Sequence, residues 1–368
     1  MFRTILKTVL CLLLILSWVQ TSGASRLVIS SVYCDTKLFR PGRGQNAAIS
    51  YNLSAPAVVT LNIYDSRDIL VRQIKSNGPV ASGPHQALWD GRDQSGKIVP
   101  GNFYLYTIKA EANGETVVYD PSDITGGKVQ KVLDVRFEKM RNEIFYVLPS
   151  DSIVNIRLGI KDGGPLLRTL IDWVPRTSGL NKEPWDGWDN CHTVNLADRQ
   201  KLQINVNAYS LPMNSIIVNS GDRQDRPAFI SEFTWNAAKR TRTRKHRKEM
   251  YNHWQHPRDK CYDPRISILL PGELRGDNTG IPVVSGRVPI QMKISGRDRK
   301  YMMDQRFEVV YYLDFVFIHE EELGYTPFSW IWNTAGVNRG IHYITVMLRG
   351  YEGHFGTATR AVKVGAGH

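Results

Sequence analysis

The residue types best suited to metal chemistry gather between positions 246 and 261. His253 and His256 are three residues apart, so a helix would place both on one side, and Cys261 follows them. Imidazole nitrogen and cysteine sulfur are ligands that zinc prefers. Oxidation of Cys261 to a disulfide is the alternative to metal binding. We expect no cofactor and no metal centre, and His253 and His256 are the candidates considered.

No other group of residues has the spacing of a catalytic site. The sequence contains no G-x-S-x-G turn, no H-E-x-x-H helix, no C-x-x-C-H haem attachment and no phosphate-binding P-loop. Glu320, Glu321 and Glu322 are adjacent, so they do not form an opposed acid–base pair, and a solvated edge explains them. The sequence therefore predicts a protein without enzymatic activity.

The first 24 residues have the pattern of a cleavable export signal. Arg3 and Lys7 precede an apolar run of 11 residues from Val9 to Val19, and small residues follow at 22–24. An uncleaved membrane anchor is the alternative, but a spanning helix needs about 20 apolar residues. Cleavage would start the mature chain at Ser25 and leave 45 basic against 35 acidic residues, with no later transmembrane segment. We expect an exported protein of the periplasm or cell surface.

The basic residues are concentrated in one segment, 221–265, which has 12 Lys and Arg against 6 Asp and Glu. Such a block repels itself and is either solvated without a dedicated partner or matched by an anionic one. Because the chain is exported, we expect an envelope or extracellular protein, an anionic polymer or a lipid surface, and no nucleic acid. The residues of this basic patch are Lys239, Arg240, Arg242, Arg244, Lys245, Arg247 and Lys248.

The elements that position these residues are predicted to be strands. A chain of 368 residues with 42% hydrophobic residues is long enough for two or three domains. Segments such as 58–64, 103–108, 153–158 and 202–206 alternate β-branched or aromatic residues with polar ones between Gly, Pro, Asn and Asp. The one long helical pattern lies around 236–256. The predicted fold is all-β, with consecutive β-sandwiches and a possible basic helix in the second linker.

An internal repeat supports this architecture. The motif Trp89-Asp90-Gly91-x-Asp93 recurs 96 residues later as Trp185-Asp186-Gly187-x-Asp189, and Ile49–Leu53 is echoed by Ile144–Leu148. An indole can fill the space between two sheets while Asp closes a turn and Gly adopts a positive φ. A calcium loop is the alternative, but the spacing lacks the carboxylates of such a loop. We expect a structural corner.

These residues resemble a known family. The run from Val71 to Ala110 resembles the immunoglobulin-like domain at the C-terminal end of the flagellar hook-capping protein FlgD, with Gly96, Pro100, Gly101 and Tyr104 at the family's turn and strand positions. The second copy replaces these turns with residues 190–198. The resemblance implies two tandem immunoglobulin-like domains and bacterial surface biology.

The last hundred residues resemble a different bacterial immunoglobulin-like module. A W-N-T turn at Trp332, Asn333 and Thr334 is followed by the G-x-H-x-I-T-V strand that starts at Gly340. His342 in that strand is expected to be a satisfied structural histidine. The expected organisation is a signal peptide at 1–24, a first FlgD-type domain at 25–119, a linker at 120–132, a second domain at 133–220, a basic linker at 221–265 and a third domain at 266–368.

The mature chain has three cysteines, so it can form one intrachain disulfide at most. We favour Cys191 with Cys261 because this bond would hold the long linker against its neighbouring domain. A disulfide that closes the loop from Cys191 to Cys261 stabilises the fold by about 4 kcal/mol in the chain-entropy model.

We therefore expect an exported, non-enzymatic scaffold, assembly or interaction protein of the bacterial cell envelope that serves a surface filament or secretion apparatus. Two alternatives remain: an adhesin or glycan-binding protein, and a metal-dependent accessory subunit of an enzyme.

Overall fold

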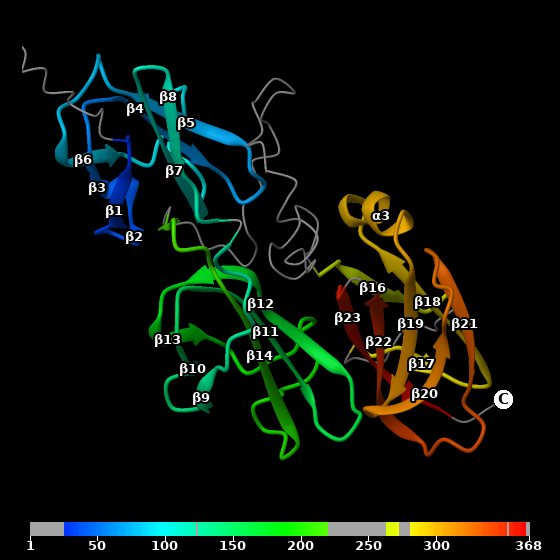
Figure 1. Cartoon of the computed structure of the whole chain (residues 1–368). Coiled ribbons are helices and arrows are strands. Elements are labelled where there is room, and N and C mark those ends of the chain that lie inside the picture. Colours follow the sequence, from blue (N-terminus) through cyan, green and yellow to red (C-terminus); the bar gives the residue numbers. More distant parts are fainter. Residues whose placement is uncertain (1–25, 123, 220–262, 272–279, 352, 366–368) are drawn as a thin grey trace, which may run out of the picture.

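The computed structural model describes residues 26–122, 124–219, 263–271, 280–351 and 353–365, and these form three β-sandwiches (Figure 1). The regular secondary structure of the described residues is almost all strand, and the strands pair into six sheets. The predicted all-β fold of three immunoglobulin-like sandwiches is confirmed. The second linker, with its possible helix, lies outside the described residues.

The first sandwich packs a three-stranded sheet against a larger one. Alternation of buried and half-buried residues along β3 follows the period of a strand with one face on the core. The smaller sheet has the order β1 (Ile29–Cys34), β3 (Ala47–Leu53), β6 (Gly83–Trp89). The larger sheet has the order β2 (Leu38–Phe39), β15 (Ser215–Val218), β7 (Asn102–Ala112), β4 (Val58–Tyr64), β5 (Leu70–Lys75), and β8 (Glu115–Tyr119) also pairs with β7.

One strand of the first sandwich comes from beyond the second. β15 pairs antiparallel with residues 102–105 of β7, while β8 pairs with residues 108–112 of the same strand. The two short strands therefore share one edge of β7, end to end. The sequence placed 215–218 in the second domain, and the structure corrects this. The four residues of β15 are apolar or small, and such a short segment has no sequence pattern that indicates which sheet it joins.

The second sandwich has two three-stranded sheets. One sheet has the order β13 (Gly179–Pro184), β10 (Glu143–Leu148), β9 (Leu133–Glu138), and the other has the order β12 (Leu166–Arg176), β11 (Ser152–Ile160), β14 (Leu202–Ser210). The segment expected as a linker at 120–132 is packed against this sandwich. A Cβ at Gly126 would lie 2.6 Å from the backbone N of Pro212, so the close approach requires glycine.

The third sandwich pairs a three-stranded with a five-stranded sheet. The smaller sheet has the order β16 (Ile266–Leu269), β18 (Arg287–Ile294), β21 (Phe328–Asn333). The larger has the order β17 (Val283–Val284), β23 (Phe355–Val364), β22 (Gly340–Gly350), β19 (Phe307–Leu313), β20 (Val316–Glu321), and the short helix α3 (Gly296–Met303) precedes β19.

Each sandwich has its own apolar core, and two smaller clusters lie where sandwiches meet. Phe103 and Ile217 of the first sandwich pack with Ile153 and Trp173 of the second. Leu166 of the second packs against Val310 and Tyr312 of the third, together with Phe355. The three cores are therefore joined by buried contacts as well as by the chain.

Candidate functional site: the contacts between sandwiches

The two tryptophan corners have the same geometry. The indole Nε1 of Trp89 donates to the carbonyl of Arg92 at 3.0 Å, and that of Trp185 donates to the carbonyl of Trp188 at 3.0 Å. Trp89 and Trp185 are both buried. Gly91 has φ +71 and Gly187 has φ +85. Each corner therefore fixes an indole in its core by a bond back to its own loop.

The aspartates of both corners are bound by their own turns. Asp90 accepts the N–H of Arg92 at 3.1 Å, and Asp186 accepts the N–H of Trp188 at 3.1 Å. Asp93 accepts the N–H and the hydroxyl of Ser95 and the N–H of Lys97. Asp189 accepts the N–H groups of Thr193 and Val194. These are turn-closing bonds of the Asx type, so each aspartate has a structural role in its own turn.

The third corner is built in a different way. Trp332 is buried in the third core, and Asn333 accepts the N–H of Ala335 at 3.0 Å. His342, on β22, lies 2.6 Å from Asp314 and also contacts the carbonyl of Asn338. Burial by itself lowers the pKa of His342, but the bonds to Asp314 and Asn338 raise it overall.

Several candidate residues fall in segments about which the structure makes no statement. The basic patch of Lys239, Arg240, Arg242, Arg244, Lys245, Arg247 and Lys248 lies outside the described residues, as do His253, His256 and Cys261. Within the described ranges, no three His, Cys, Asp or Glu side chains form a cluster that could hold a metal ion.

The most elaborate polar contact joins the second and third sandwiches. Arg157, on β11, donates from Nε to Asp263 at 3.0 Å and from Nη2 at 2.6 Å. Both residues are buried, at 7% and 6% exposed. The hydroxyl of Thr169, on β12, also donates to Asp263 at 2.5 Å. A buried ion pair is tolerated where both partners are well bonded, as they are here.

Further bonds tie this pair to both sandwiches. Asp172 accepts the N–H of Asp263 at 2.7 Å, and Asp263 accepts the N–H of Phe355 at 3.0 Å. Arg157 donates to the carbonyl of Gly353 at 2.9 Å, and its guanidinium lies 4.3 Å from the centre of the Phe355 ring. Asp263 therefore connects β11 and β12 to the start of β23.

A polar pocket of about 380 Å³ adjoins this contact and is lined by residues that include Arg168, Cys191, Asp263, Arg265 and Thr357. Cys191 carries no disulfide in the structure, and its sulfur accepts the N–H of Thr359 at 3.4 Å. Burial raises the pKa of the Cys191 thiol. The expected partner of Cys191, Cys261, lies outside the described residues, so the disulfide stays a prediction.

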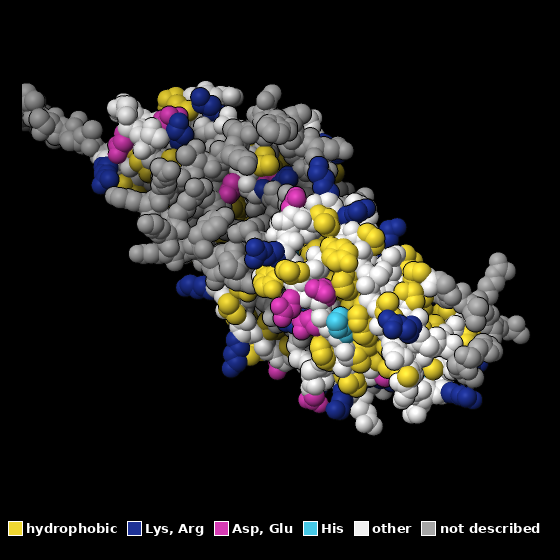
Figure 2. Space-filling view, turned by 90° about the vertical axis from the view of Figure 1, so that its right-hand side faces the viewer, with side chains coloured by type: hydrophobic (Ala, Val, Ile, Leu, Met, Phe, Trp, Pro, Cys, Tyr) yellow, Lys and Arg dark blue, Asp and Glu magenta, His cyan; other side chains and the backbone are white. Residues whose placement is uncertain are grey.

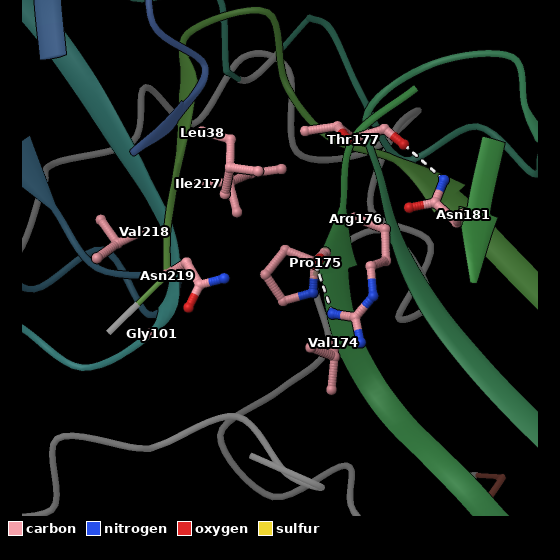
Figure 3. A pocket seen from close by; sticks show the side chains of 10 residues that line it. All are labelled: Leu38, Gly101, Val174, Pro175, Arg176, Thr177, Asn181, Ile217, Val218 and Asn219. Carbon is pink, nitrogen blue, oxygen red and sulfur yellow. Dashed lines mark hydrogen bonds between the residues drawn. The ribbon is translucent and has the colours of Figure 1, made fainter. Parts of the chain in front are cut away.

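The contact between the first and second sandwiches holds a smaller pocket of about 260 Å³. Figure 3 shows Leu38 and Ile217 from the first sandwich on one side and Pro175 and Arg176 from β12 on the other. Arg176 donates to both carboxylate oxygens of Glu183, at 2.7 and 3.0 Å. Burial lowers the pKa of Arg176, but Glu183 raises it overall, so this guanidinium stays charged beside the pocket.

Glu320 and Glu321 are the last residues of β20, an edge strand of the third sandwich, and Glu322 follows them. Arg349 is 3.7 Å from Glu320 and 3.7 Å from Glu308. Burial and the charge of Glu308 raise the pKa of Glu320. Figure 2 shows acidic side chains beside a band of hydrophobic ones on one face of the molecule. The carboxylates are paired on a strand edge rather than opposed across a cleft.

Sequence reasoning missed Arg157, Asp172 and Asp263. A usable signal was present in the first two, because each is a charged residue with an apolar or aromatic neighbour on both sides within a strand. Asp263 lies in a segment without periodicity, so its role depends on contacts that the chain makes far from it in sequence.

Comparisons with known proteins agree with part of this description. Residues 37–115 match the family model described as the FlgD Ig-like domain. A solved structure of FlgD from P. aeruginosa is 27% identical, with a TM-score of 0.22, over 33% of this chain and 85% of that chain. No curated protein matches this chain significantly.

Other solved structures are less similar in sequence. Fibronectin(III)-like modules of CbhA from Clostridium thermocellum are 9% identical, with a TM-score of 0.19, over 92% of each chain. A 1.5-MDa bacterial ice-binding adhesin is 8% identical, with a TM-score of 0.19, over 93% of this chain and 99% of that one. TM-scores this low support no inference about how the three sandwiches are arranged.

In the described ranges, no helix has the length and apolar content that crossing a membrane requires.

Proposed function

We propose that this protein is an exported, non-enzymatic scaffold of the bacterial cell envelope that serves the assembly of a surface filament or secretion apparatus. The observation that carries the proposal is the buried contact of Arg157 with Asp263, which fixes the third sandwich against the second. A protein whose modules act only as flexible spacers has no need of buried charged contacts between them. A scaffold has that need, because it must hold binding surfaces at a set separation.

The match of residues 37–115 to the FlgD Ig-like domain supports an envelope role for the first sandwich. The second sandwich is, in this proposal, a diverged copy of the first. Arg72 donates to the carbonyl of Asp93 at 2.9 Å, and Arg168 donates to that of Asp189 at 3.3 Å. Both residue pairs are displaced by 96 positions, the same interval as the tryptophan corners.

The partner in this proposal is an acidic protein, an anionic polymer or a lipid surface that the basic patch recognises. Basic side chains on a segment between two fixed sandwiches would contact such a partner at a defined place on the scaffold. Salt screens contacts between exposed charges over about 8 Å at physiological ionic strength, so binding of this kind weakens as salt rises.

The test is retention of the envelope partner by the purified mature chain at increasing salt. The variant replaces all seven residues of the basic patch with Gln, and we expect it to lose salt-sensitive retention. A matched control removes seven exposed charges elsewhere by changing Lys75, Lys97, Lys128, Lys131, Lys161, Lys293 and Lys300 to Gln. Equal retention by the two variants would exclude the basic patch from the mechanism.

Export is tested separately. The mature chain recovered from the periplasm or the medium should begin at Ser25, as read by N-terminal sequencing. An intact leader on protein recovered from the cytoplasm would contradict the envelope role.

An adhesin or glycan-binding role is the second candidate, and an aromatic group at one edge of the third sandwich favours it. His319 stacks on Trp330 with ring centres 4.6 Å apart and planes 9° apart. Tyr325 beside this group is half exposed. Aromatic faces at a surface are suited to sugar rings. Binding to a glycan array that is lost in Tyr325→Ala and kept in the variant that replaces the basic patch with Gln would favour this role over the scaffold.

A further inference from the structure

In the part of the chain that the structure describes, the second sandwich has no edge strand like the one that completes each of the other two. In the first sandwich β8 and β15 together cover the outer edge of β7, and in the third β23 covers the edge of β22. The equivalent strand of the second sandwich is β14, which pairs with β11 on its other side. After β14 the chain leaves to supply β15 to the first sandwich. Among the described residues, no strand of this sheet lies beyond β14.

Only one end of this edge is covered by described residues. The N–H of Gln130 donates to the carbonyl of Ala208, and the N–H of Ser210 donates to the carbonyl of Lys128. The other end closes in a turn, in which the N–H of Leu202 donates to the carbonyl of Arg199. Residues 203–207 lie between these two ends, and Asn205 is at their centre.

The backbone groups of two residues point out of this edge. Successive residues of a strand direct their N–H and C=O groups to alternate sides. Because Ala208 and Ser210 bond to residues 128–130, Ile204 and Val206 direct their groups to the same side. Among the described residues, no hydrogen bond involves these groups of Ile204 or Val206, and each is a donor and an acceptor that favours pairing.

The side chains at this edge are incompletely covered as well. Ile204 and Val206 face the second core but are only partly buried. The matching residues of the complete sandwiches, Tyr106 and Ile108 of β7 and Ile344 of β22, are buried. In those sandwiches the covering strand places its own apolar side chains beside them.

This edge also lacks the usual protection against pairing. Natural edge strands carry charges, prolines or bulges that prevent another strand from adding. Residues 202–207 are Leu-Gln-Ile-Asn-Val-Asn, with no charge and no proline, and β14 pairs with β11 through nine residues without a register shift. By contrast, the edge strands β9 and β20 carry charged residues and register shifts.

We propose that β14 pairs antiparallel with β14 of a second copy of this chain, about a two-fold axis through Asn205. Ile204 then exchanges two hydrogen bonds with the partner's Val206, and Val206 exchanges two with the partner's Ile204. The two three-stranded sheets join into one continuous sheet, and each copy supplies the edge strand that the other lacks.

A second copy fits this edge because the edge is self-complementary. Residues 203–207 are bounded at both ends and are centred on Asn205. When this segment pairs antiparallel with the same segment of a second copy, Ile204 lies against the partner's Val206 on the core side. Asn205 meets the partner's Asn205 on the other face, where the two amides can bond. The stretch is uncharged, so two strongly basic chains meet here without placing like charges opposite each other.

The test is a disulfide trap in the mature chain. Residues opposite each other at a position without backbone bonds have Cα atoms about 4.5 Å apart, so Asn205→Cys should link two copies through the introduced cysteines under mild oxidation. Gln203→Cys alone should not do so, because Gln203 lies opposite the partner's Asn207. A mixture of Gln203→Cys and Asn207→Cys chains should crosslink. Peptide mapping separates these bonds from any that the native cysteines form.

A second measurement removes the dependence on oxidation. Asn205→Lys sets two like charges opposite each other and should raise the dimer dissociation constant by about fivefold in sedimentation velocity, whereas Asn207→Lys, with the same charge change, should have a smaller effect. Mixing Asn205→Lys with Asn205→Asp chains should restore the dimer. The proposal would be overturned by any one of three results. The wild-type chain could stay monomeric at about 100 µM, Gln203→Cys alone could crosslink, or Asn205→Lys could leave the dimer unaffected.

Discussion

Arg157 and Asp263 lie 106 positions apart in the sequence, and two hydrogen bonds join them in the buried contact between the second and third sandwiches. Thr169 and Asp172 of β12 bind the same short segment. Because β11 and β12 belong to one sandwich and Phe355 to the next, Asp263 bonds to both units, beside the apolar contact of Leu166 with Val310 and Tyr312.

Replacing one partner of this ion pair should destabilise the protein more than replacing both partners with apolar residues. Arg157→Met leaves Asp263 buried without its cation, and we expect the free energy of unfolding to fall by about 3 kcal/mol. The double variant Arg157→Met with Asp263→Leu should lose less than the single variants. Chemical denaturation measures both, and small-angle scattering follows the separation of the sandwiches. Lys139→Ala, in an exposed ion pair with Asp198, is the control and should cost less than about 1 kcal/mol.

The tryptophan corners should be equally important to their own sandwiches. Trp89→Ala and Trp185→Ala each remove a buried indole and its bond to the loop, so each should lower stability by about 3 to 5 kcal/mol. Trp188→Ala, in which the side chain is 36% exposed, is the control in the same loop. Thermal denaturation of the mature chain measures all three. A loss with Trp188→Ala as large as that with Trp185→Ala would contradict the structural role of the corner.

β15 should stabilise the first sandwich, although it follows the second in sequence. Ile216 is fully buried in the first core, so Ile216→Ala should cost about 2 to 5 kcal/mol. In the Ile216→Ala variant, the backbone amide hydrogens of residues 102–105, which pair with β15, should exchange faster than those of residues 108–112, which pair with β8. The reverse order would show that β8 depends on β15. Met213→Ala, at an exposed position just before the strand, is the control.

The third sandwich should become less stable as pH rises through the titration of His342. Its pKa in the folded state is above the ordinary value of 6.5, because bonds to Asp314 and Asn338 outweigh the opposing effect of burial. Protonation therefore stabilises the fold. The stabilisation is complete below about pH 6.5 and is lost as pH rises through the raised pKa. NMR titration of His342 measures the shift, and His342→Gln should remove this part of the pH dependence from thermal denaturation curves.

Cys191 should be bonded to Cys261 in protein recovered from an oxidising compartment. Peptide mapping without reductant should find the linked pair, and Cys191→Ala should lower the melting temperature only when reductant is absent. Alkylation of Cys191 in the native protein without reductant would contradict this bond. Cys34→Ala is the control, since no disulfide is predicted for it.

Much of the fold could be predicted because the signals are local. The alternation along β3 and the tryptophan corners at 89 and 185 both indicate which side chains face a core. These signals depend only on residues that are close together in the sequence. Strand β15 could not be assigned in this way, because Ile216 and Val218 are compatible with either neighbouring sheet. The basic patch was identified from composition alone, and it lies outside the described residues.

The sequence by itself determined the all-strand fold and the repeated corners and predicted an export signal, because hydrophobic alternation, turn chemistry and a charged leader are properties of neighbouring residues. Only the tertiary structure decided that Asp263 bridges two sandwiches, that β15 completes the first, and that no described strand covers the outer edge of β14. Pairing between strands depends on which segments meet in space. Residues a hundred positions apart carry no local pattern that specifies such a meeting.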